Sequence, residues 1–538
     1  MMTAKEILGP LPEFFNFATD VVDRWAKDPQ KLALHWVDQR GERERRLTFA
    51  DVRDQSRSLA GELVARGLVP GDRVGIVIGR EPAWWIGMIA ILRAGMIAVP
   101  GTTQLTSRDL LYRIRQGSIR GFLADEASAE KLDAVREHCP EVKAWIATGS
   151  SRPYWQSFDD AAKSSAAFSP VATRADDPAL LYFTSGTTGP PKRVLHTHVS
   201  YPLGHSITGK LWLDLKSDDL HWNLSDTGWA KAAWSSLFGP WSQGAAIFVQ
   251  EPGPRFEPLA ALATIRRFPI TTFCAPPTVY RQLVTCDLGT PPLGTLRHAV
   301  AAGEPLNPEV IAAWERATGI VIRDGFGQTE TTLLAGNFPG EPVRPGSMGK
   351  AAPGFAIEIL DDDLQPLPAD QEGEIAVRIK PERPIGLFLG YEGNPEENGR
   401  KFQGDYYLTG DRGRRDADGY LWFVGRNDDI ILSAGYRIGP FEVESALIEH
   451  PAVQEAAVIS VPDPVRYEIV KAFVLLAPGY SPSAELAGEL QEHVRRVTAP
   501  YKYPREVEFV ESLPKTVSGK IRRVELRERE ARRSIGQQ

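Results

Sequence analysis

A segment of hydroxyl-bearing residues, glycines and one lysine has the composition expected of a polyphosphate-binding loop. It follows the apolar run Ala179–Phe183, which the pattern predicts to be a buried strand. Glycine lets backbone N–H groups approach oxyanions, Ser and Thr donate hydrogen bonds, and lysine adds a mobile positive charge. The Gly-Lys-Ser/Thr ending of a P-loop is missing, and a solvated Gly/Pro/Thr turn is the alternative. The candidate residues are Thr184, Ser185, Gly186, Thr187, Thr188, Gly189 and Lys192.

Five further motifs follow, and each carries groups that suit one part of a nucleotide or its reaction partner. In chain order they are Ser225–Trp229, Gly303–Pro305, Asp324–Glu330, Thr409–Asp411 and Leu513–Lys520. The first pairs a carboxylate with an aromatic wall, and the second follows a predicted strand and could flank a purine. The third combines an aromatic face and a hydroxyl with a carboxylate that can hold Mg²⁺. The fourth offers a carboxylate to the vicinal hydroxyls of a ribose, and the fifth places a lysine on a predicted exposed turn.

The segments that must position these motifs alternate between strand-like and helix-like patterns. Residues 73–78 predict a strand and residues 83–94 a buried helix, an alternation typical of βαβ units around parallel sheets. Two more strands, at 271–276 and 298–302, each run into a loop. Loops at the carboxyl ends of such strands are where α/β proteins bind ligands. Residues 355–379 alternate between apolar residues and acidic or Pro-rich turns, which predicts an antiparallel subdomain.

Beyond Arg426 the chain changes into a smaller unit. A helix is predicted at 441–450 and strands at 456–461 and 472–476, and the tail from Tyr501 onward is basic. We therefore expect an α/β fold. Its large N-terminal domain has βαβ-type sheets flanked by helices plus the antiparallel β subdomain, and its C-terminal domain is a smaller α+β unit. The predicted boundaries are 1–425 for the large domain, 426–429 for a hinge and 430–538 for the small domain.

The composition narrows the class of protein. With 538 residues, 42% of them apolar, the chain can bury a large core and should hold two or more domains. A formal net charge of −7 argues against a general binder of nucleic acid or of anionic membranes. The cysteines Cys139, Cys274 and Cys286 are far apart and in no metal-ligand spacing, which fits a reducing compartment. No signal peptide or membrane span is predicted, so we expect a soluble, intracellular protein.

Taken together and in this order, the motifs resemble those of the adenylate-forming acyl-CoA synthetase family, which includes acyl-CoA ligases, luciferases and peptide-synthetase adenylation domains. The resemblance covers roughly residues 30–530. It implies that the loop at 184–192 binds the phosphates of ATP, that Glu330 carries Mg²⁺ and that Asp411 binds the ribose. It also implies that Arg426 contacts ribose and phosphate. The residues implied to frame the adenine and the α-phosphate are Gly303, Glu304, Pro305, Asp324, Gly325, Phe326, Gln328 and Thr329.

The implied reaction brings a carboxylate to the α-phosphorus of ATP, so an anion approaches a polyanion and positive charges must neutralise the approach. The resemblance assigns this task to Mg²⁺, Arg426 and Lys520, with Lys520 bridging the carboxylate and the α-phosphate. Pyrophosphate leaves, and the thiol of CoA then attacks the acyl-adenylate and expels AMP. Rotation of a mobile small domain about Asp428 would let Lys520 and the thiol reach the same carbonyl in turn. We therefore expect ATP, Mg²⁺ and CoA to be required.

The resemblance also implies sites for CoA and for the acyl chain. The CoA-binding candidates are Gly435, Tyr436, Arg437, Arg466, Lys502 and Arg505. The last three are assigned mainly from their charge, and exposed surface positions are the alternative. Trp229 and Gly327 are implied to lie beside the acyl chain. Gly327 stands where acetate-specific relatives have a tryptophan that closes the pocket, so we expect a pocket that admits longer acids.

Within the family, four segments are most similar to the medium-chain acyl-CoA synthetases: residues 384–386, 436–440, 450–453 and 499–505. Mitochondrial members of that branch carry a targeting segment, and none is visible here, so we expect a cytoplasmic enzyme. Two departures from the family are Phe326, where many relatives have Tyr, and Arg193, where many have Gly; the second puts the mobility of the phosphate loop in doubt.

The expected partners are a small carboxylic acid, ATP and CoA, without nucleic acid or integral membrane association and with the oligomeric state open. Several alternatives to a medium-chain acid:CoA ligase stay open at this point. The channel implied by Gly327 admits bulk as readily as length, so the substrate could be an aryl or branched-chain acid. A luciferase-like oxidative enzyme and a carrier-protein loader share the first half-reaction. A catalytically silent nucleotide binder should have lost Glu330, Asp411 or Lys520, and all three are present.

Overall fold

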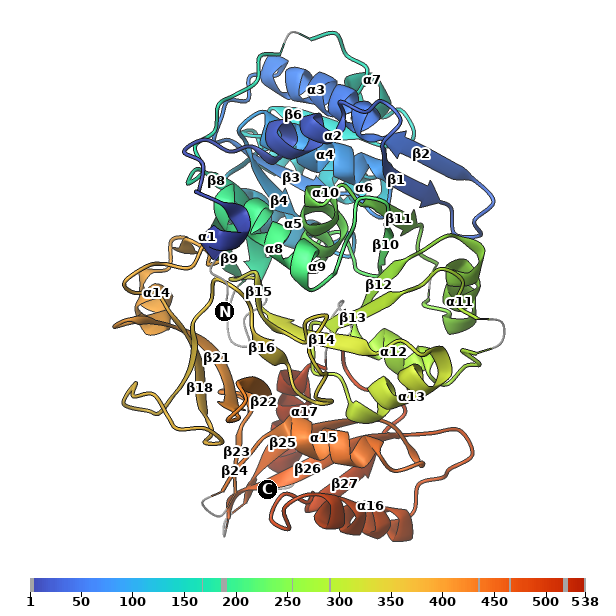
Figure 1. The fold of residues 1–538 in the computed structure, drawn as a ribbon, viewed down its shortest axis with the longest axis vertical. Coiled ribbons are helices and arrows are strands. Elements are labelled where there is room, and N and C mark those ends of the chain that lie inside the picture. Colours follow the sequence, from blue (N-terminus) through green and yellow to red (C-terminus); the bar gives the residue numbers. More distant parts are fainter. Residues whose placement is uncertain are drawn as a thin grey trace.

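The computed structural model describes residues 4–166, 168–184, 191–253, 255–289, 292–433, 436–463, 466–515 and 521–536. Three sheets organise these residues (Figure 1). Two large sheets and their helices form the upper and middle parts of the molecule in that view, and the third sheet lies in the lower part with the C-terminus. The expected fold class, a large α/β N-terminal part with a smaller C-terminal domain, is confirmed.

The first sheet changes from parallel to antiparallel along its length. Strands β1, β11, β10, β12, β13 and β14 run parallel, and the pairs from β14 to β18 are antiparallel. This confirms the predicted strands at 271–276 and 298–302 and the antiparallel subdomain. In spatial order the strands are β17 (Ile357–Leu360), β18 (Gly373–Arg378), β21 (Tyr406–Arg415), β22 (Tyr420–Arg426), β16 (Gly349–Ala351), β15 (Leu333–Gly336), β14 (Ile322–Gly327), β13 (His298–Ala302), β12 (Thr272–Ala275), β10 (Leu220–Asn223), β11 (Ala246–Gln250), β1 (Leu32–Val37) and β2 (Glu44–Thr48), with β20 (Phe402–Gln403) beside β21.

The second sheet contains the βαβ unit predicted near the start of the chain. Helix α4 (Pro82–Arg93) is buried at every position, as expected of a helix that is apolar on all faces. Strands β8 and β9 form an antiparallel hairpin, and β19 pairs with β9. In spatial order the strands are β19 (Gly390–Tyr391), β9 (Lys192–Thr197), β8 (Pro178–Thr184), β4 (Ile97–Pro100), β3 (Arg73–Val77), β5 (Ile119–Ala124), β6 (Ala144–Ala147) and β7 (Gln156–Ser157).

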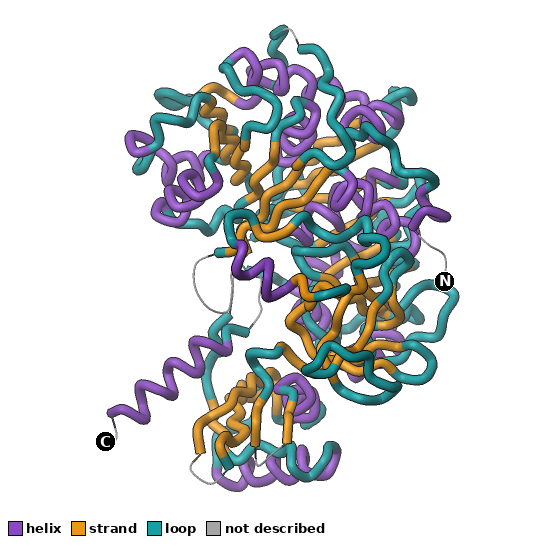
Figure 2. The backbone as a smooth tube through the Cα atoms, turned by 90° about the vertical axis from the view of Figure 1, so that its left-hand side faces the viewer, coloured by secondary structure: helices purple, strands orange, loops and turns teal. Residues whose placement is uncertain are grey.

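The third sheet is formed by residues that follow Arg426. Its order is β24 (Tyr436–Ile438), β23 (Ile431–Ser433), β26 (Tyr467–Leu476) and β25 (Val453–Asp463), and β27 (Glu506–Phe509) pairs with β26. Helices α15 (Pro440–Ile448), α16 (Ala484–Val497) and α17 (Arg523–Gly536) accompany it. Figure 2 shows α17 on the outside of this part, where Leu526 packs against Phe473 and Ile459. The hinge and the boundaries 1–425 and 430–538 stay predictions.

The other helices begin where local capping favours them. Thr48 and Asp51 form a capping box at α3, and Thr106 and Asp109 form another at α5. Within the described ranges, every helix is too short or too polar to cross a bilayer. The helices are α1 (Ala4–Leu8), η1 (Ala18–Val22), α2 (Asp23–Trp25), α3 (Phe49–Ala65), α5 (Ser107–Gly117), α6 (Glu126–Asp133), η2 (Arg136–His138), α7 (Phe158–Ala161), η3 (Val199–Leu203), α8 (Gly204–Leu211), α9 (Ala230–Ala233), η4 (Trp234–Phe238), α10 (Gly239–Ser242), α11 (Pro258–Arg267), α12 (Pro277–Leu283), α13 (Pro308–Thr318) and α14 (Pro395–Lys401).

Candidate active site

The predicted phosphate loop is the connection of the β8–β9 hairpin. Thr184 at the end of β8 faces Lys192 at the start of β9 in the strand register. Residues Ser185, Gly186, Thr187, Thr188 and Gly189 lie outside the described residues. Lys192 does not extend freely: its Nζ pairs with Glu397 Oε1 at 2.5 Å and lies 5.2 Å from the ring centroid of Tyr391. Helix α14, which carries Glu397, therefore holds the lysine at the base of the loop.

Two motifs far apart in the sequence meet through Gln328. Its Nε2 donates to Asp411 Oδ2 at 2.6 Å and to the Thr409 carbonyl at 3.0 Å. Its Oε1 accepts a hydrogen bond from the Tyr407 hydroxyl at 3.1 Å. The end of β14 and the strand β21 are thereby joined, and Asp411, only 4% exposed, is held in a fixed direction. A buried, oriented carboxylate suits recognition of a pair of hydroxyls.

Glu330 is oriented by a tyrosine that sequence reasoning did not single out. The hydroxyl of Tyr391 donates to Glu330 Oε1 at 2.8 Å. Burial and the neighbouring Glu330 charge raise the pKa of Tyr391 well above its ordinary value, so the phenol keeps its proton and remains a donor. The neighbouring Thr329 is fixed through its carbonyl, which accepts from His196 Nε2 at 2.7 Å. The carboxylate of Glu330 therefore stands on a rigid turn.

Arg426 lies at the end of β22, directly opposite Asp411 in the β21–β22 register. Its Nε is 4.0 Å from Asp411 Oδ1 and 3.4 Å from Asp428 Oδ1, and its side chain is 48% exposed. These carboxylates raise the pKa of the guanidinium, although burial acts in the opposite direction. Three residues predicted for the ribose, the phosphate and the hinge therefore form one charged cluster.

The predicted adenine frame lies at the carboxyl ends of β13 and β14. Gly303 has a φ of +111°, and a Cβ built there would have no atom of the described residues within 4 Å, so the backbone is exposed on that side. Glu304 Oε2 pairs with Arg281 at 2.9 Å, whereas its Oε1 is buried and has no hydrogen-bond partner in the described ranges. Pro305 is half-buried next to it.

The neighbouring Asp324 is a buried acid whose pKa is raised. Burial raises its pKa to about 8, although the N–H groups of Leu306 and Gly325 donate to the two carboxyl oxygens. Phe326, two residues on, is half-buried at the end of the same strand. Asp324 therefore supports the loop at 303–306 and the strand end that carries Phe326.

The two predicted acyl-pocket residues lie in different surroundings. Gly327 is exposed, but a Cβ built there would lie 2.7 Å from the Thr332 carbonyl oxygen, so any side chain requires the backbone to shift. Trp229 is half-buried and its Nε1 is among the buried atoms without a partner in the described ranges.

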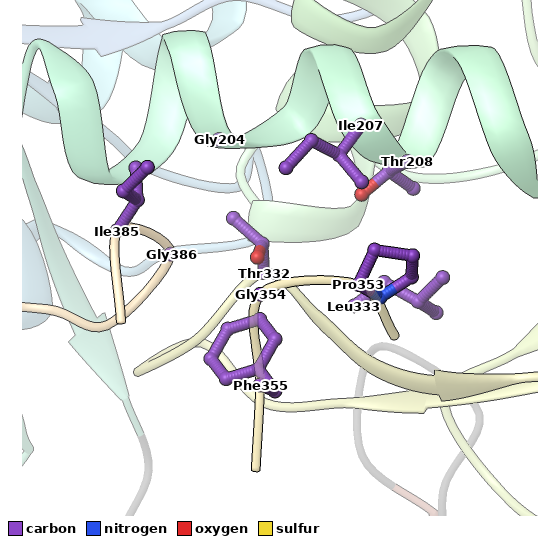
Figure 3. Close-up of a pocket in the computed structure, with 10 residues that line it drawn as sticks. All are labelled: Gly204, Ile207, Thr208, Thr332, Leu333, Pro353, Gly354, Phe355, Ile385 and Gly386. Carbon is purple, nitrogen blue, oxygen red and sulfur yellow. The ribbon is translucent and has the colours of Figure 1, made fainter. Parts of the chain in front are cut away.

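A narrow apolar gap adjoins Thr332 (Figure 3). It is lined by side chains that include Ile207, Leu333 and Phe355. Its volume of about 10 Å³ has room for one water molecule and not for an acyl chain. This gap is therefore not the acyl pocket in the arrangement described.

The CoA-binding candidates are spread over the small domain. Tyr436 stacks on Tyr501 with ring centroids 4.1 Å apart, which gives an exposed aromatic surface. Lys502 is ion-paired with Glu442, and Arg505 lies 4.2 Å from the ring centroid of Tyr503. Arg466 is half-buried and caps a turn through its backbone N–H to Asp463. Gly435 and Lys520 lie outside the described residues, as does the side chain of Arg437.

Two comparisons of the sequence with known proteins identify the family of this chain. The family model described as "AMP-binding enzyme" matches residues 21–391, and the model "AMP-binding enzyme C-terminal domain" matches residues 442–520. The acyl-coenzyme A synthetase ACSM3, mitochondrial, of Mus musculus is 50% identical over 97% of this chain and 91% of its own.

Solved structures show the same similarity in three dimensions. The anthranilate CoA ligase AuaEII, in complex with anthranoyl-AMP, has a TM-score of 0.89 at 32% identity and covers 98% of this chain and 99% of its own. An acyl-CoA synthetase of Brucella canis has a TM-score of 0.75 at 35% identity and covers 98% and 96%.

One expectation is wrong. The cytoplasmic location was inferred from the lack of a visible targeting segment, but the mouse relative at 50% identity is named as mitochondrial. Relatives from rat and human carry the same designation. The absence of a recognisable leader in a sequence is a weak guide to compartment, because such segments are defined by composition rather than by fixed residues.

Proposed function

The chain belongs to the family of AMP-binding enzymes and is an ATP-dependent acyl-CoA synthetase, and on this premise we propose that it activates medium-chain fatty acids. The observation that carries the nucleotide site is the cluster joined by Gln328 and Arg426, which places Asp411 and Glu330 on neighbouring, hydrogen-bonded elements. ATP, a carboxylic acid and CoA are the substrates of this family's acid:CoA ligases.

In the proposed site Asp411 accepts hydrogen bonds from the ribose hydroxyls, and Gln328 keeps it oriented. Arg426, half-exposed beside Asp411, supplies positive charge where ribose and α-phosphate meet. The exposed backbone at Gly303 leaves room for the adenine. We assign the remaining phosphate contacts to the hairpin loop that starts at Thr184.

Glu330 fits a Mg²⁺ site. One oxygen accepts from Tyr391, which leaves the second free of hydrogen-bond partners in the described ranges, and Mg²⁺ commonly takes one or two carboxylates together with substrate phosphates. When bound, Mg²⁺ would offset the charge of the phosphate oxygens. Tyr391 contributes by holding the carboxylate in one orientation, so little order is lost on binding.

The two half-reactions require a change of partner at one carbonyl. We assign the first half-reaction, adenylation, to Lys520, which would draw the carboxylate towards the α-phosphate. We assign the replacement of Lys520 by the thiol of CoA to a rotation of the small domain about Asp428. Asp428 lies 3.4 Å from Arg426, so hinge and nucleotide site share an ion pair. Because the hinge residue contacts a residue of the nucleotide site, loss of pyrophosphate can change the hinge contact and so couple rotation to completion of adenylation.

Lys520 gives a sharp test of this division. Lys520→Ala should lower acid-dependent pyrophosphate release by roughly 100-fold or more, because a positioned charge at a developing anion contributes that much. The same variant should convert a supplied acyl-adenylate and CoA to acyl-CoA at nearly the wild-type rate. Equal loss in both half-reactions would contradict the assignment.

An aromatic acid is the second candidate substrate. It is favoured by the structural similarity to a ligase of anthranilate and by the missing side chain at Gly327. A hydrophobic pocket separates acids by only about 1–3 kcal/mol per methylene, so a range of substrates is expected in either case.

The deciding experiment measures CoA-dependent AMP release by the purified protein with ATP and Mg²⁺ across acids from acetate to dodecanoate, and with benzoate and anthranilate. A maximum at medium chain length supports the proposal. A maximum at an aromatic acid keeps the ligase chemistry and replaces the substrate. Pyrophosphate release without CoA consumption would instead favour a carrier-protein loader or an oxidative relative.

A further inference from the structure

A lysine that belongs to none of the sequence motifs lies against the strand that carries Asp411. Lys401 is the last residue of α14. A Cβ built on Gly410 would lie 2.5 Å from Lys401 Nζ, so the ammonium sits directly over the backbone of Gly410. Gly410 has a φ of +81°, in the left-handed region that favours glycine. The absence of a side chain at position 410 therefore makes room for the ammonium next to Asp411.

Three carboxylates influence the charge of the ammonium. Glu374, Asp411 and Glu330 favour its charged form, and Arg426 disfavours it. Burial is the largest influence and lowers the pKa of Lys401. In the described part of the chain, no carboxylate oxygen lies within the 4.0 Å of an ion pair with Lys401. It differs in this from Lys192, which pairs directly with Glu397. The charge of Lys401 thus lies near several carboxylates, and among the described residues it forms a direct ion pair with none of them.

The backbone on both sides of Lys401 is fixed. Asn398, one turn earlier in α14, accepts from the N–H of Tyr391 and donates to its carbonyl, both at 2.8 Å. On the other side Phe402 pairs with Tyr407 in the β20–β21 register. Tyr391 is the residue that orients Glu330, and Tyr407 is the residue that orients Gln328. Lys401 is therefore held by the elements that build the nucleotide site, and little order remains to be lost on binding.

On the proposed function, we propose that Lys401 binds the phosphate groups of ATP, as a nucleotide-site cation additional to Arg426 and Lys520. A lysine is a compact point charge with three donors, which suits phosphate oxygens. Glu330, Glu374 and Asp411 all influence the charge of Lys401, and carboxylates near a polyanion repel it. Lys401 offsets that repulsion in the region between Asp411, which is proposed to bind the ribose, and Glu330, which is proposed to bind Mg²⁺.

The test is direct binding of ATP and of adenosine to the purified protein without acid or CoA, by calorimetry, so that it does not depend on turnover. Lys401→Met should weaken ATP binding by about tenfold or more, the usual effect of losing one charge-assisted hydrogen bond, and leave adenosine binding unchanged. Lys401→Arg should bind ATP to within a few-fold of wild type. Lys401→Gln serves as the second neutral variant where Lys401→Met does not fold.

The matched control is Arg400→Met. Arg400 is the preceding residue of the same helix, is exposed and pairs with Glu396, with a longer contact of 3.9 Å to Glu397. Its loss removes the same charge from α14 without removing a group that lies over Gly410. ATP binding should stay at the wild-type level in this variant. Equal weakening of ATP and adenosine by Lys401→Met, or no weakening of either, would overturn the proposal. If wild type binds ATP but activates no carboxylic acid, the proposed function fails while the role of Lys401 is still decided.

Discussion

At the scale of single residues, the site depends on side chains that orient other side chains. Gln328 touches Asp411, Thr409 and Tyr407 and so uses both ends of its amide. Its donor end faces a carboxylate at 2.6 Å, which fixes the amide orientation because the reverse would set two acceptors together. A residue of this kind adds no chemistry of its own, but it decides where the reactive carboxylate points.

This predicts the effect of Gln328→Glu. The substitution keeps the shape of the side chain but sets a second carboxylate against Asp411, so repulsion should displace the ribose acceptor. We expect the KM for ATP to rise roughly 10- to 100-fold, with smaller changes in the KM for the acid and for CoA. Steady-state kinetics with each substrate varied in turn measure this.

The control for Gln328→Glu is Tyr407→Phe, which removes one neutral hydrogen bond to Gln328 and should raise the KM for ATP by less than about tenfold. A KM for ATP in Gln328→Glu equal to that of wild type would mean that Asp411 is not part of the nucleotide site.

At the scale of elements, α14 connects parts of the site that the sequence keeps apart. Its Glu397 holds Lys192 at the base of the hairpin loop, and its Lys401 lies over Gly410 on β21. The helix reaches both because β19, just before it, pairs with β9 and because β20, just after it, pairs with β21. These two short strand pairings thus place α14, whose composition is that of an exposed helix, in the active site.

Glu397→Gln tests whether α14 restrains the loop lysine. In the present arrangement Lys192 must leave Glu397 before it can reach a phosphate, so neutralising Glu397 should lower the KM for ATP a few-fold. Glu396→Gln, on the exposed side of the same helix, should leave it unchanged. A rise in the KM would mean that Glu397 positions Lys192 for ATP rather than withholding it.

The same helix shows what the sequence could predict and what it could not. Asp411 and Glu330 were recognisable because each lies in a motif with unusual residue types at fixed spacing. The segment Pro395–Lys401 has the composition of a solvated helix. Its role follows from the pairing of β19 with the distant strand β9, where Gly390 faces Leu195, and from the local pairing of β20 with β21. Strands β12 and β13 were predictable from continuous apolar runs, whereas the tight contact of Gly327 with Thr332 depends on the turn between β14 and β15.

At the scale of the whole molecule, buried histidines couple the stability of the large domain to pH. Burial lowers the pKa of His196, His198 and His298 to about 4 and that of His221 to about 3. Between pH 6.5 and about 4 the unfolded chain binds protons that the folded chain does not, so the free energy of unfolding falls on acidification. Asp324, with its pKa raised to about 8, acts with the opposite slope over the same range. Burial also lowers the pKa of His35 and His205 and raises the pKa of Glu81, Asp226 and Glu309. Six histidines thus oppose four acids, and stability should decline below pH 6.5.

Thermal unfolding at pH 7.0 and pH 5.0 in buffers of equal ionic strength measures this decline, and His298→Gln isolates one group. His298 Nε2 donates to the Trp212 carbonyl at 2.8 Å, and a glutamine amide can replace that donor without a titrating ring. The variant should lose less stability between the two pH values, by up to about 1.4 kcal/mol per pH unit below pH 6.5. A loss of stability between the two pH values that is the same in His298→Gln and wild type would mean that the folded protein protonates His298. Close packing in the core opposes this, because the charge would need water or a carboxylate beside it.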